Sequence, residues 1–582
     1  MLQLIFHIII ITAFCFIWGV PALLVLNKIK TENNYWNRTS LSMLTFVFFS
    51  GIISLSIVTA WVFLWFPLNF TFLLLLTAAL IAILLLFKKK EIKNAFKSFE
   101  NSSSLSLLEI SFIVVILLLF VLLGSIETVN RDTGIYHIQI ILWTNEYAVV
   151  PGIANLFPRY GLGSNWFNLI SSFRFPFLKN ENFTYLNSTL AIWFFLWLFN
   201  NWRWHLNNFI HHLANKIFSL FYLLVILFCL LDWELFRDAA NSTNYDFIAT
   251  ALTIIIIAWL IESILVKEIN KSSSLFFIIL CLSIIPFKLS GIFVLLLLLY
   301  FLIYNNQLNY WLQTVVVVFI ILTPLLIKNY ITTGYLLYPL TWSIFPPDWQ
   351  VPAGMTDYLR NYIFTTNRFY NYYEIDYTRI PELLNKPWIS SWFNGILIQH
   401  KIIFIASFSS LSLFFFKNML PIDYKKLKLL FILLFLMAFG WFITAPSPRF
   451  GYGVLLFLAF FPFCYYAGFL FTPFIQRMIV IVIIAATSFY IYKKTLTFSE
   501  NGNLLLYPVA PLNTNFKPIS INGTNFYLPD KMNNMWMRKC NAIKLPCITQ
   551  ENNFLEPRGK NLKDGFRMKQ QPDSTFIRNY NY

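Results

Sequence analysis

Long apolar runs recur along almost the whole chain, and they constrain its fold more than any other feature. A run of about 20 apolar residues is long enough for a helix to cross the hydrocarbon core of a bilayer. Hydrophobic residues make up 58% of the 582 residues and charged residues only 12%, whereas about a quarter of a soluble protein is charged. The span-length rule predicts an all-α polytopic membrane protein with roughly 13 to 14 transmembrane helices.

The spans divide the chain into three regions. Residues 1–104 are expected to form N-terminal transmembrane helices, 105–492 a transmembrane core, and 493–582 a small polar C-terminal domain. The first run is too long and too uncharged for a signal peptide, so it is expected to be retained. The expected spans are 2–26, 41–64, 70–87, 107–123, 185–199, 217–231, 247–265, 275–287, 289–304, 311–327, 396–416, 429–444, 454–471 and 478–492.

The net charge of +17 is interpreted through the membrane composition. Basic loops set topology and meet anionic lipid, so we expect the lipid bilayer as a partner and no nucleic acid. Placing the basic run from Lys88 to Lys97 in the cytoplasm and alternating the spans puts both chain ends outside. One outer face then collects the loops that hold Asp132, Asp238, Lys288, Tyr338 and Arg449.

Cysteine placement bears on the C-terminal domain. Cys540 and Cys547 lie together in this polar region, whereas the other four cysteines lie in apolar runs and are interpreted as packing residues. An outside position permits a disulfide between the pair. If the last predicted span does not cross, the domain lies inside, and this alternative stays open.

The stretch after the fourth span is the first candidate site. Asp132 follows Arg131 and precedes Tyr136 and His137, with Arg159 further along the same loop. Ionisable residues at the mouth of a span indicate function by default. A carboxylate beside a cation stays ionised and can accept a proton from an incoming hydroxyl. The alternative is a helix cap or a solvated loop residue.

A second outer loop is acidic. If its carboxylates converge with Asp132, they could share a divalent cation, although no fixed spacing requires one and the metal question stays open. For Asp246, at the start of a span, the alternative is a helix N-cap. The charged residues of this loop are Asp232, Glu234, Arg237, Asp238 and Asp246.

Basic residues occupy three further turns on the predicted outer face. Lys288 lies in PFKLSG, Arg449 in APSPRFGYG, and Lys328 in IKNYITTGYLLYP, which also contains Tyr338. Each lysine either snorkels to the interface or holds an anionic ligand. Three basic residues on one face, beside carboxylates, favour an anionic lipid-linked ligand.

The motifs RDTGIYH, NYDF, FKLSG, KN-x3-TG-x3-YP and PSPRFGYG resemble, in this order, the layout of the GT-C superfamily of membrane glycosyltransferases. The C-terminal C-x6-C, PRG and DGF motifs resemble a largely uncharacterised family of bacterial multi-pass membrane proteins. The chain departs from the GT-C pattern by having RD followed by Thr133 where members often have paired acids. It also has three spans before the key helix, where a simple member has one.

The resemblance implies a GT-C-like core and a function. Its members take a sugar from a polyprenyl phosphate or diphosphate and pass it to a glycan or lipid acceptor. Asp132 would be the catalytic carboxylate, and Lys288 and Arg449 would bind the donor phosphate. The expected location is the inner (cytoplasmic) membrane, with the active face extracytoplasmic or periplasmic. The alternatives are a surface-polysaccharide polymerase or ligase, a transporter or flippase of lipid-linked sugars, and a scaffold without chemistry.

Overall fold

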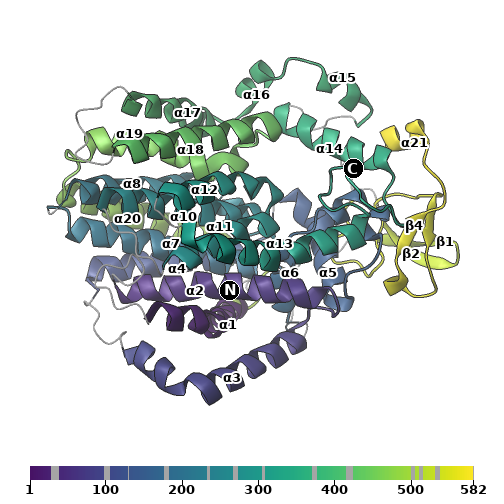
Figure 1. Ribbon diagram of the computed structural model, residues 1–582, viewed down its shortest axis with the longest axis horizontal. Helices are drawn as coiled ribbons and strands as arrows, with labels where there is room; N and C mark the ends of the chain where they lie inside the picture. Colours follow the sequence, from purple (N-terminus) through teal and green to yellow (C-terminus); the bar gives the residue numbers. More distant parts are fainter. Residues whose placement is uncertain are drawn as a thin grey trace.

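A computed structural model gives the fold of the chain. The described residues are 1–27, 39–97, 105–128, 130–175, 178, 183–210, 212–232, 236–266, 273–304, 308–369, 377–414, 424–499, 505–509, 515–530 and 538–580. Glu234 of the acidic loop lies outside them. The described chain is a bundle of helices with four short strands near its C-terminus (Figure 1). The predicted all-α polytopic class is therefore confirmed.

Ten helices in the described residues are long and apolar enough to cross a membrane. Each of them overlaps one of the predicted spans, because span length and composition can be read directly from the sequence. They are α1 (Leu2–Asn27), α2 (Ser40–Phe63), α3 (Phe70–Lys97), α4 (Leu107–Ser125), α8 (Leu213–Leu231), α10 (Asp246–Val266), α13 (Trp311–Thr333), α18 (Tyr424–Thr444), α19 (Pro448–Ala467) and α20 (Pro473–Ser499).

The remaining four predicted spans also coincide with helices. Three of these are shorter apolar segments: α11 (Ser273–Phe287), η7 (Leu289–Val294) with α12 (Leu295–Tyr304), and α17 (Ile398–Ser407) with η10 (Phe408–Phe414). The fourth, α7 (Tyr185–Asn207), continues well beyond its predicted end and is buried along most of its length. It carries Asn200, Asn201 and Arg203 inside the bundle, so burial rather than hydropathy marks it as part of the core.

The segments between the spans form short helices at one end of the bundle. The loop after α4 contains η3 (Thr133–His137), α5 (Ile138–Glu146), η4 (Ile153–Asn155), η5 (Pro158–Gly161) and α6 (Asn165–Ser172), as its proline and glycine punctuation predicts. The prediction of a long loop after residue 327 is corrected, since α13 runs on to Thr333. The other short helices are α9 (Asp238–Ala240), η8 (Leu308–Tyr310), α14 (Ala353–Arg368), η9 (Tyr377–Arg379), α15 (Ile380–Leu384) and α16 (Ile389–Gly395).

Small residues allow the helices to approach closely, as in other membrane bundles. A Cβ at Gly51 of α2 would lie 1.8 Å from the carbonyl oxygen of Cys15 in α1, and one at Gly453 of α19 would lie 2.7 Å from Cβ of Thr253 in α10. Alanine at either position would therefore push two backbones apart. The second contact holds α19 against α10, and both helices line the site described below.

The C-terminal region is a small β unit seated on the loop after α4. Strands β1 (Phe516–Ile521) and β2 (Thr524–Pro529) form one antiparallel pair, and β3 (Leu555–Pro557) and β4 (Phe566–Met568) form another, followed by α21 (Ser574–Asn579). Cys540 and Cys547 form a disulfide. The backbone N–H of Asn541 donates to the carbonyl of Gly134 in η3 at 2.8 Å. The unit thus lies at the same end of the bundle as Asp132 (Figure 1).

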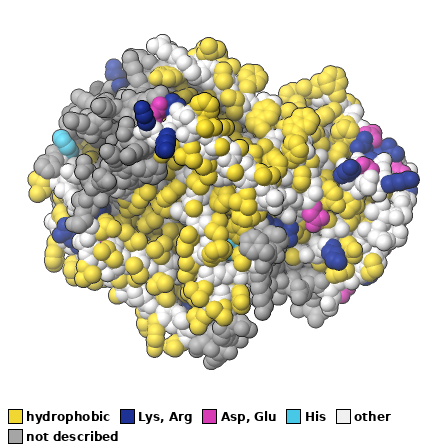
Figure 2. Space-filling view, turned by 90° about the horizontal axis from the view of Figure 1, so that it is seen from below, with side chains coloured by type: hydrophobic (Ala, Val, Ile, Leu, Met, Phe, Trp, Pro, Cys, Tyr) yellow, Lys and Arg dark blue, Asp and Glu magenta, His cyan; other side chains and the backbone are white. Residues whose placement is uncertain are grey.

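The surface agrees with a membrane setting. The face in Figure 2 is mostly hydrophobic, and charged side chains gather toward its two ends, one of which carries the C-terminal strands. Exposed apolar residues on α3 and α18 include Leu86 and Phe439. Such a broad apolar surface suits lipid rather than water.

Candidate functional site

Asp132 lies at the entrance to η3, a π-helical turn, where helical irregularity often accompanies function. Its carboxylate makes no side-chain cap hydrogen bond, and the Asn130 side chain accepts from the Thr133 backbone N–H instead. The Arg159 guanidinium donates to Asp132 Oδ1 at 3.0 Å, and the Asp132 side chain is 30% exposed. Asp132 is therefore an accessible carboxylate held by an arginine, and the helix-cap alternative does not describe it.

Aromatic and polar side chains surround this ion pair. Arg159 lies over the Tyr136 ring, 5.6 Å from its centroid, so Tyr136 shares the environment of Asp132 as its helical offset predicts. The Tyr136 hydroxyl is hydrogen-bonded to Tyr245, and burial together with the Tyr245 and Asp132 charges raises the pKa of Tyr136. Both phenols are thus neutral at physiological pH and act as hydrogen-bonding groups.

His137 occupies the wall behind Asp132. Its Nδ1 lies 2.9 Å from the Thr243 hydroxyl, while Nε2 is buried with no hydrogen-bond partner among the described residues. Burial lowers the pKa of His137 to about 4, the charges of Asp132 and Asp246 raise it, and those of Arg449 and Arg159 lower it. His137 is therefore neutral near pH 7 and lies within electrostatic range of two charged clusters.

The second cluster joins three residues from three segments. Asp246, at the start of α10, accepts from Lys288 Nζ at 2.6 Å and lies 3.4 Å from Arg449 Nε. Lys288 Nζ also lies 3.1 Å from the centroid of the Phe450 ring, a cation–π contact. The carboxylate of Asp246 is thus engaged by two cations rather than by a helix N-terminus alone. Two cations and one carboxylate leave a formal charge of +1.

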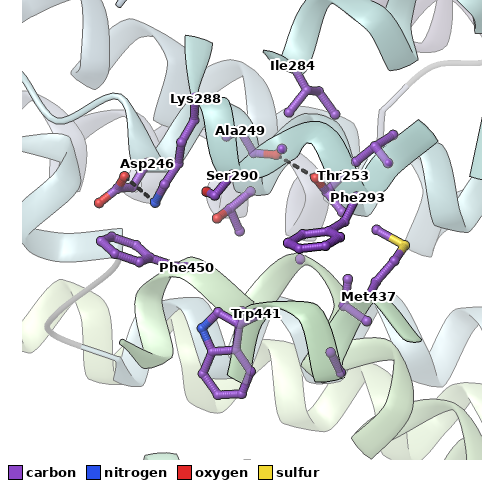
Figure 3. Close-up of a pocket in the computed structure, with 17 residues that line it drawn as sticks. Asp246, Ala249, Thr253, Ile284, Lys288, Ser290, Phe293, Met437, Trp441 and Phe450 are labelled. Atoms are coloured by element: carbon purple, nitrogen blue, oxygen red, sulfur yellow. Dashed lines mark hydrogen bonds and ion pairs between the residues drawn. The ribbon is translucent and has the colours of Figure 1, made fainter. Parts of the chain in front are cut away.

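A cavity of about 60 Å³ opens beside this cluster (Figure 3). Its polar end contains Asp246, Lys288 and Ser290, and its walls are apolar side chains from α10, α11, η7, α18 and α19. Ser290 is exposed, as is the neighbouring Ile292, so the cavity opens on an apolar part of the surface. The other labelled wall residues are Ala249, Thr253, Ile284, Phe293, Met437, Trp441 and Phe450. The cavity suits an anionic group attached to a hydrocarbon chain.

Burial affects the lysine at the mouth of this cavity. Desolvation lowers the pKa of Lys288 to about 8, and the hydrogen bond and charge of Asp246 oppose the change. Lys288 stays mostly protonated at pH 7 because of this partner. A bound phosphate would hold the lysine charged in the same way.

The other predicted residues have separate positions. Lys328 donates to the Gly163 carbonyl at 2.8 Å, and the Tyr338 hydroxyl donates to the Pro158 carbonyl at 3.0 Å, so both support the loop that carries Arg159. Arg131 is exposed; burial, and after it the charge of Arg131, lowers the pKa of Lys539 in the C-terminal unit. Asp238 begins the short helix α9. Among the described residues, no group of three or more His, Cys, Asp or Glu side chains could hold a metal ion.

The sequence does not assign several of the partners to the Asp132 site, although Tyr245 belongs to the NYDF motif. Thr243 and Tyr245 contact His137 and Tyr136 from the loop before α10, and only tertiary packing brings them there. The C-terminal unit also contributes, since Gln139 Nε2 donates to the carbonyls of Asn541 and Ile543. The loop that carries Asp132 is therefore also the place where the C-terminal unit packs against the bundle.

Fold and site together define a class: a multi-pass helical membrane protein with a carboxylate and a cationic, apolar-walled cavity near one end of its bundle. The chain matches one family model over residues 1–456, that of a domain of unknown function, DUF8201, and it belongs to this family. The match includes Asp132, Asp246, Lys288 and Arg449, and ends within α19. No curated protein and no solved structure matches the chain.

Proposed function

We propose that this protein is a membrane glycosyltransferase. It takes a sugar from a polyprenyl-phosphate-linked donor and passes it to a glycan or lipid acceptor on the outer face of the cytoplasmic membrane. The observation that carries the proposal is the cavity at Lys288, a cation that shares Asp246 with Arg449. This cavity joins a cationic end to an apolar wall, near the accessible carboxylate of Asp132. The GT-C-like order of motifs agrees with it.

The proposed step assigns a role to each charged residue. The acceptor hydroxyl oxygen attacks the anomeric carbon of the sugar, and the bond from that carbon to the phosphate oxygen breaks. Asp132 receives the hydroxyl proton as general base. The electron pair leaves with the phosphate oxygen, whose added negative charge Lys288 and Arg449 stabilise in a partly desolvated site. No metal is required by this balance.

The Arg159 contact holds the base in place, since its guanidinium donates to Asp132 Oδ1 at 3.0 Å. The leaving group in the proposed step, the lipid-linked phosphate, is a stabilised anion.

Asp132→Asn tests the proposal. Asparagine keeps the size of the side chain and an acceptor for Arg159 but cannot take a proton. We expect sugar transfer from a lipid-linked donor in isolated membranes to fall at least ~10²-fold, the usual scale for loss of a general base. Glu146→Gln, an exposed carboxylate in the same segment, is the matched control and should retain activity. Full turnover by the Asp132→Asn protein would refute Asp132 as the base.

A transporter or flippase of lipid-linked sugars is the second candidate, and one observation favours it. His205 Nε2 lies 2.9 Å from Glu262 Oε1, both side chains are buried, and the Tyr222 hydroxyl donates to the same oxygen at 2.8 Å. Buried ionisable pairs within membrane helices often relay protons. Glu262→Gln should abolish transport of a lipid-linked sugar if this candidate is right, and should leave sugar transfer at the Asp132 end intact if the protein is a transferase. A polymerase or ligase would use the same site with a glycan acceptor.

A further inference from the structure

A second cavity near Asp132 contains hydrogen-bond donors without a carboxylate. It holds about 40 Å³, roughly three times the space that one water needs. Its lining comes from the end of α2, from α5, from the loop through η5 to α6, and from α13. No aspartate or glutamate is among its lining residues, whereas the Lys288 cavity contains Asp246.

Three nitrogen groups give this cavity hydrogen-bond donors. Trp143 Nε1 and Asn168 Nδ2 are buried, and neither has a hydrogen-bond partner among the described residues. Lys328 is 6% exposed, and its ammonium group gives one hydrogen bond, to the Gly163 carbonyl. A buried donor left without a partner is costly, so this arrangement indicates a ligand that accepts hydrogen bonds.

Three of the four hydroxyl groups of the lining are already engaged. Ser164 donates to the Phe287 carbonyl, Tyr160 to the Cys547 carbonyl, and Thr332 to the Lys328 carbonyl. Among the described residues, the donors left to a ligand are therefore one ammonium, one amide, one indole N–H and the Thr144 hydroxyl. This set matches the lone pairs of a compact oxyanion, a carboxylate or a phosphate ester.

The position of the cavity relative to Asp132 suggests what carries the anion. Tyr160 lines the cavity, and the adjacent Arg159 holds Asp132. We propose that the cavity binds the acidic group of the acceptor substrate, a carboxylate or phosphate ester, and so places the acceptor hydroxyl beside Asp132. The acceptor role rests on the proposed function, whereas the anion site stands on its own geometry.

The test uses the full-length protein in phosphatidylcholine nanodiscs, with inorganic phosphate and acetate as probes and thermal unfolding as the readout. A Lys288→Met background weakens the other cationic cavity and isolates this one. Both anions should raise the melting temperature saturably in that background. Adding Lys328→Met should raise the apparent Kd at least about tenfold, the effect of losing a charge-assisted contact.

Asn168→Asp keeps Lys328 in place and introduces repulsion, so it should cause the same loss even if Lys328→Met folds poorly. Trp143→Phe should weaken binding about three- to tenfold by removing one neutral donor. Asn525→Asp adds the same charge at an exposed position on β2 and should change nothing. Unchanged anion stabilisation in the Asn168→Asp and Lys328→Met proteins would overturn the inference.

The two proposals fail separately. If Lys288→Met alone removes all stabilisation by the anions, the Lys328 cavity is refuted as an anion site and the Lys288 cavity stands as one. If Lys288→Met has no effect on polyprenyl phosphate binding while Lys328→Met still abolishes acetate binding, the Lys288 cavity is refuted as the phosphate site. The Lys328 cavity then stands as an anion site. Replacing part of the lipid with phosphatidylglycerol separates two sources of the anion: competition with acetate assigns the site to a lipid headgroup, and no competition assigns it to a soluble acceptor.

Discussion

Asp246→Asn is the most informative perturbation of the Lys288 cavity, because the Asp246 carboxylate lies between two cations, where a bound anion would lie. Lys288 Nζ lies 2.6 Å and Arg449 Nε 3.4 Å from its carboxylate, and its side chain is only 5% exposed. Asparagine removes the charged partner that the two cations share. Breaking a buried ion pair in this way costs about 3–5 kcal/mol of unfolding free energy. The 29% exposure of the Arg449 side chain places the expected loss near the lower end of that range.

The same substitution should improve anion binding. With Asp246 neutral, the formal charge of the cluster rises from +1 to +2, so an added phosphate replaces the lost partner. We expect polyprenyl phosphate to bind the Asp246→Asn protein about tenfold or more tightly than the natural protein, as expected for a charge-assisted contact. Its stabilisation by phosphate should grow by up to about 1.4 kcal/mol for a tenfold gain, since the stabilisation by a ligand follows the logarithm of its affinity.

The assay is thermal unfolding in nanodiscs, with and without polyprenyl phosphate, for the natural protein, Asp246→Asn, and Asp246→Asn combined with Lys288→Met. The double variant removes one cation together with the anion, so it should recover part of the lost stability. An Asp246→Asn protein with natural stability and no gain in phosphate affinity would refute the cluster as an anion site.

Three further predictions concern other parts of the molecule. The pKa of His137 is about 4 in the folded protein against 6.5 in the unfolded chain. This shift contributes stability that is present above pH 6.5 and is lost as the pH falls toward 4. Between pH 7.5 and pH 5, the unfolding free energy of the His137→Asn protein should therefore fall by about 2 kcal/mol less than that of the natural protein, measured by denaturation at each pH. Alkylation mass spectrometry of fresh membranes should find Cys540 and Cys547 oxidised, and two free thiols would contradict the outside placement. Reporter fusions after residues 97 and 165 should report opposite sides, and a same-side result would reject the topology.

The helices of the bundle could be predicted because each span depends on local composition alone. Where prediction ended too early, as at α7 and α13, polar residues continue the helix inside the protein. Asn200 of α7, for example, donates to the Ser42 hydroxyl of α2 at 2.8 Å, so its polarity is satisfied by a neighbouring helix. A sequence window contains no information about such a partner.

In the candidate site, likewise, single residues could be predicted from the sequence, but the contacts between them could not. Asp132, Lys288 and Arg449 could be singled out because a charged residue beside an apolar run is unusual wherever it lies. The sequence does not indicate that Asp246 pairs with both cations, since the three residues come from separate segments. It also gives no sign that Asn168 and Trp143 face the same cavity as Lys328. These arrangements depend on helix packing, including the close contact of Gly453 with Thr253.

The two cavities differ in a way that bears on the order of binding. In the Lys288 cavity an internal carboxylate neutralises one cation, so the folded protein is stable without a ligand, and a phosphate must compete with Asp246. In the Lys328 cavity no carboxylate serves this purpose, and two buried donors have no partner among the described residues. A ligand there gains the full benefit of satisfying them. The Lys328 cavity should therefore bind its anion without displacing a protein group. Under the function proposed above, the acceptor would then be positioned before the donor phosphate displaces Asp246.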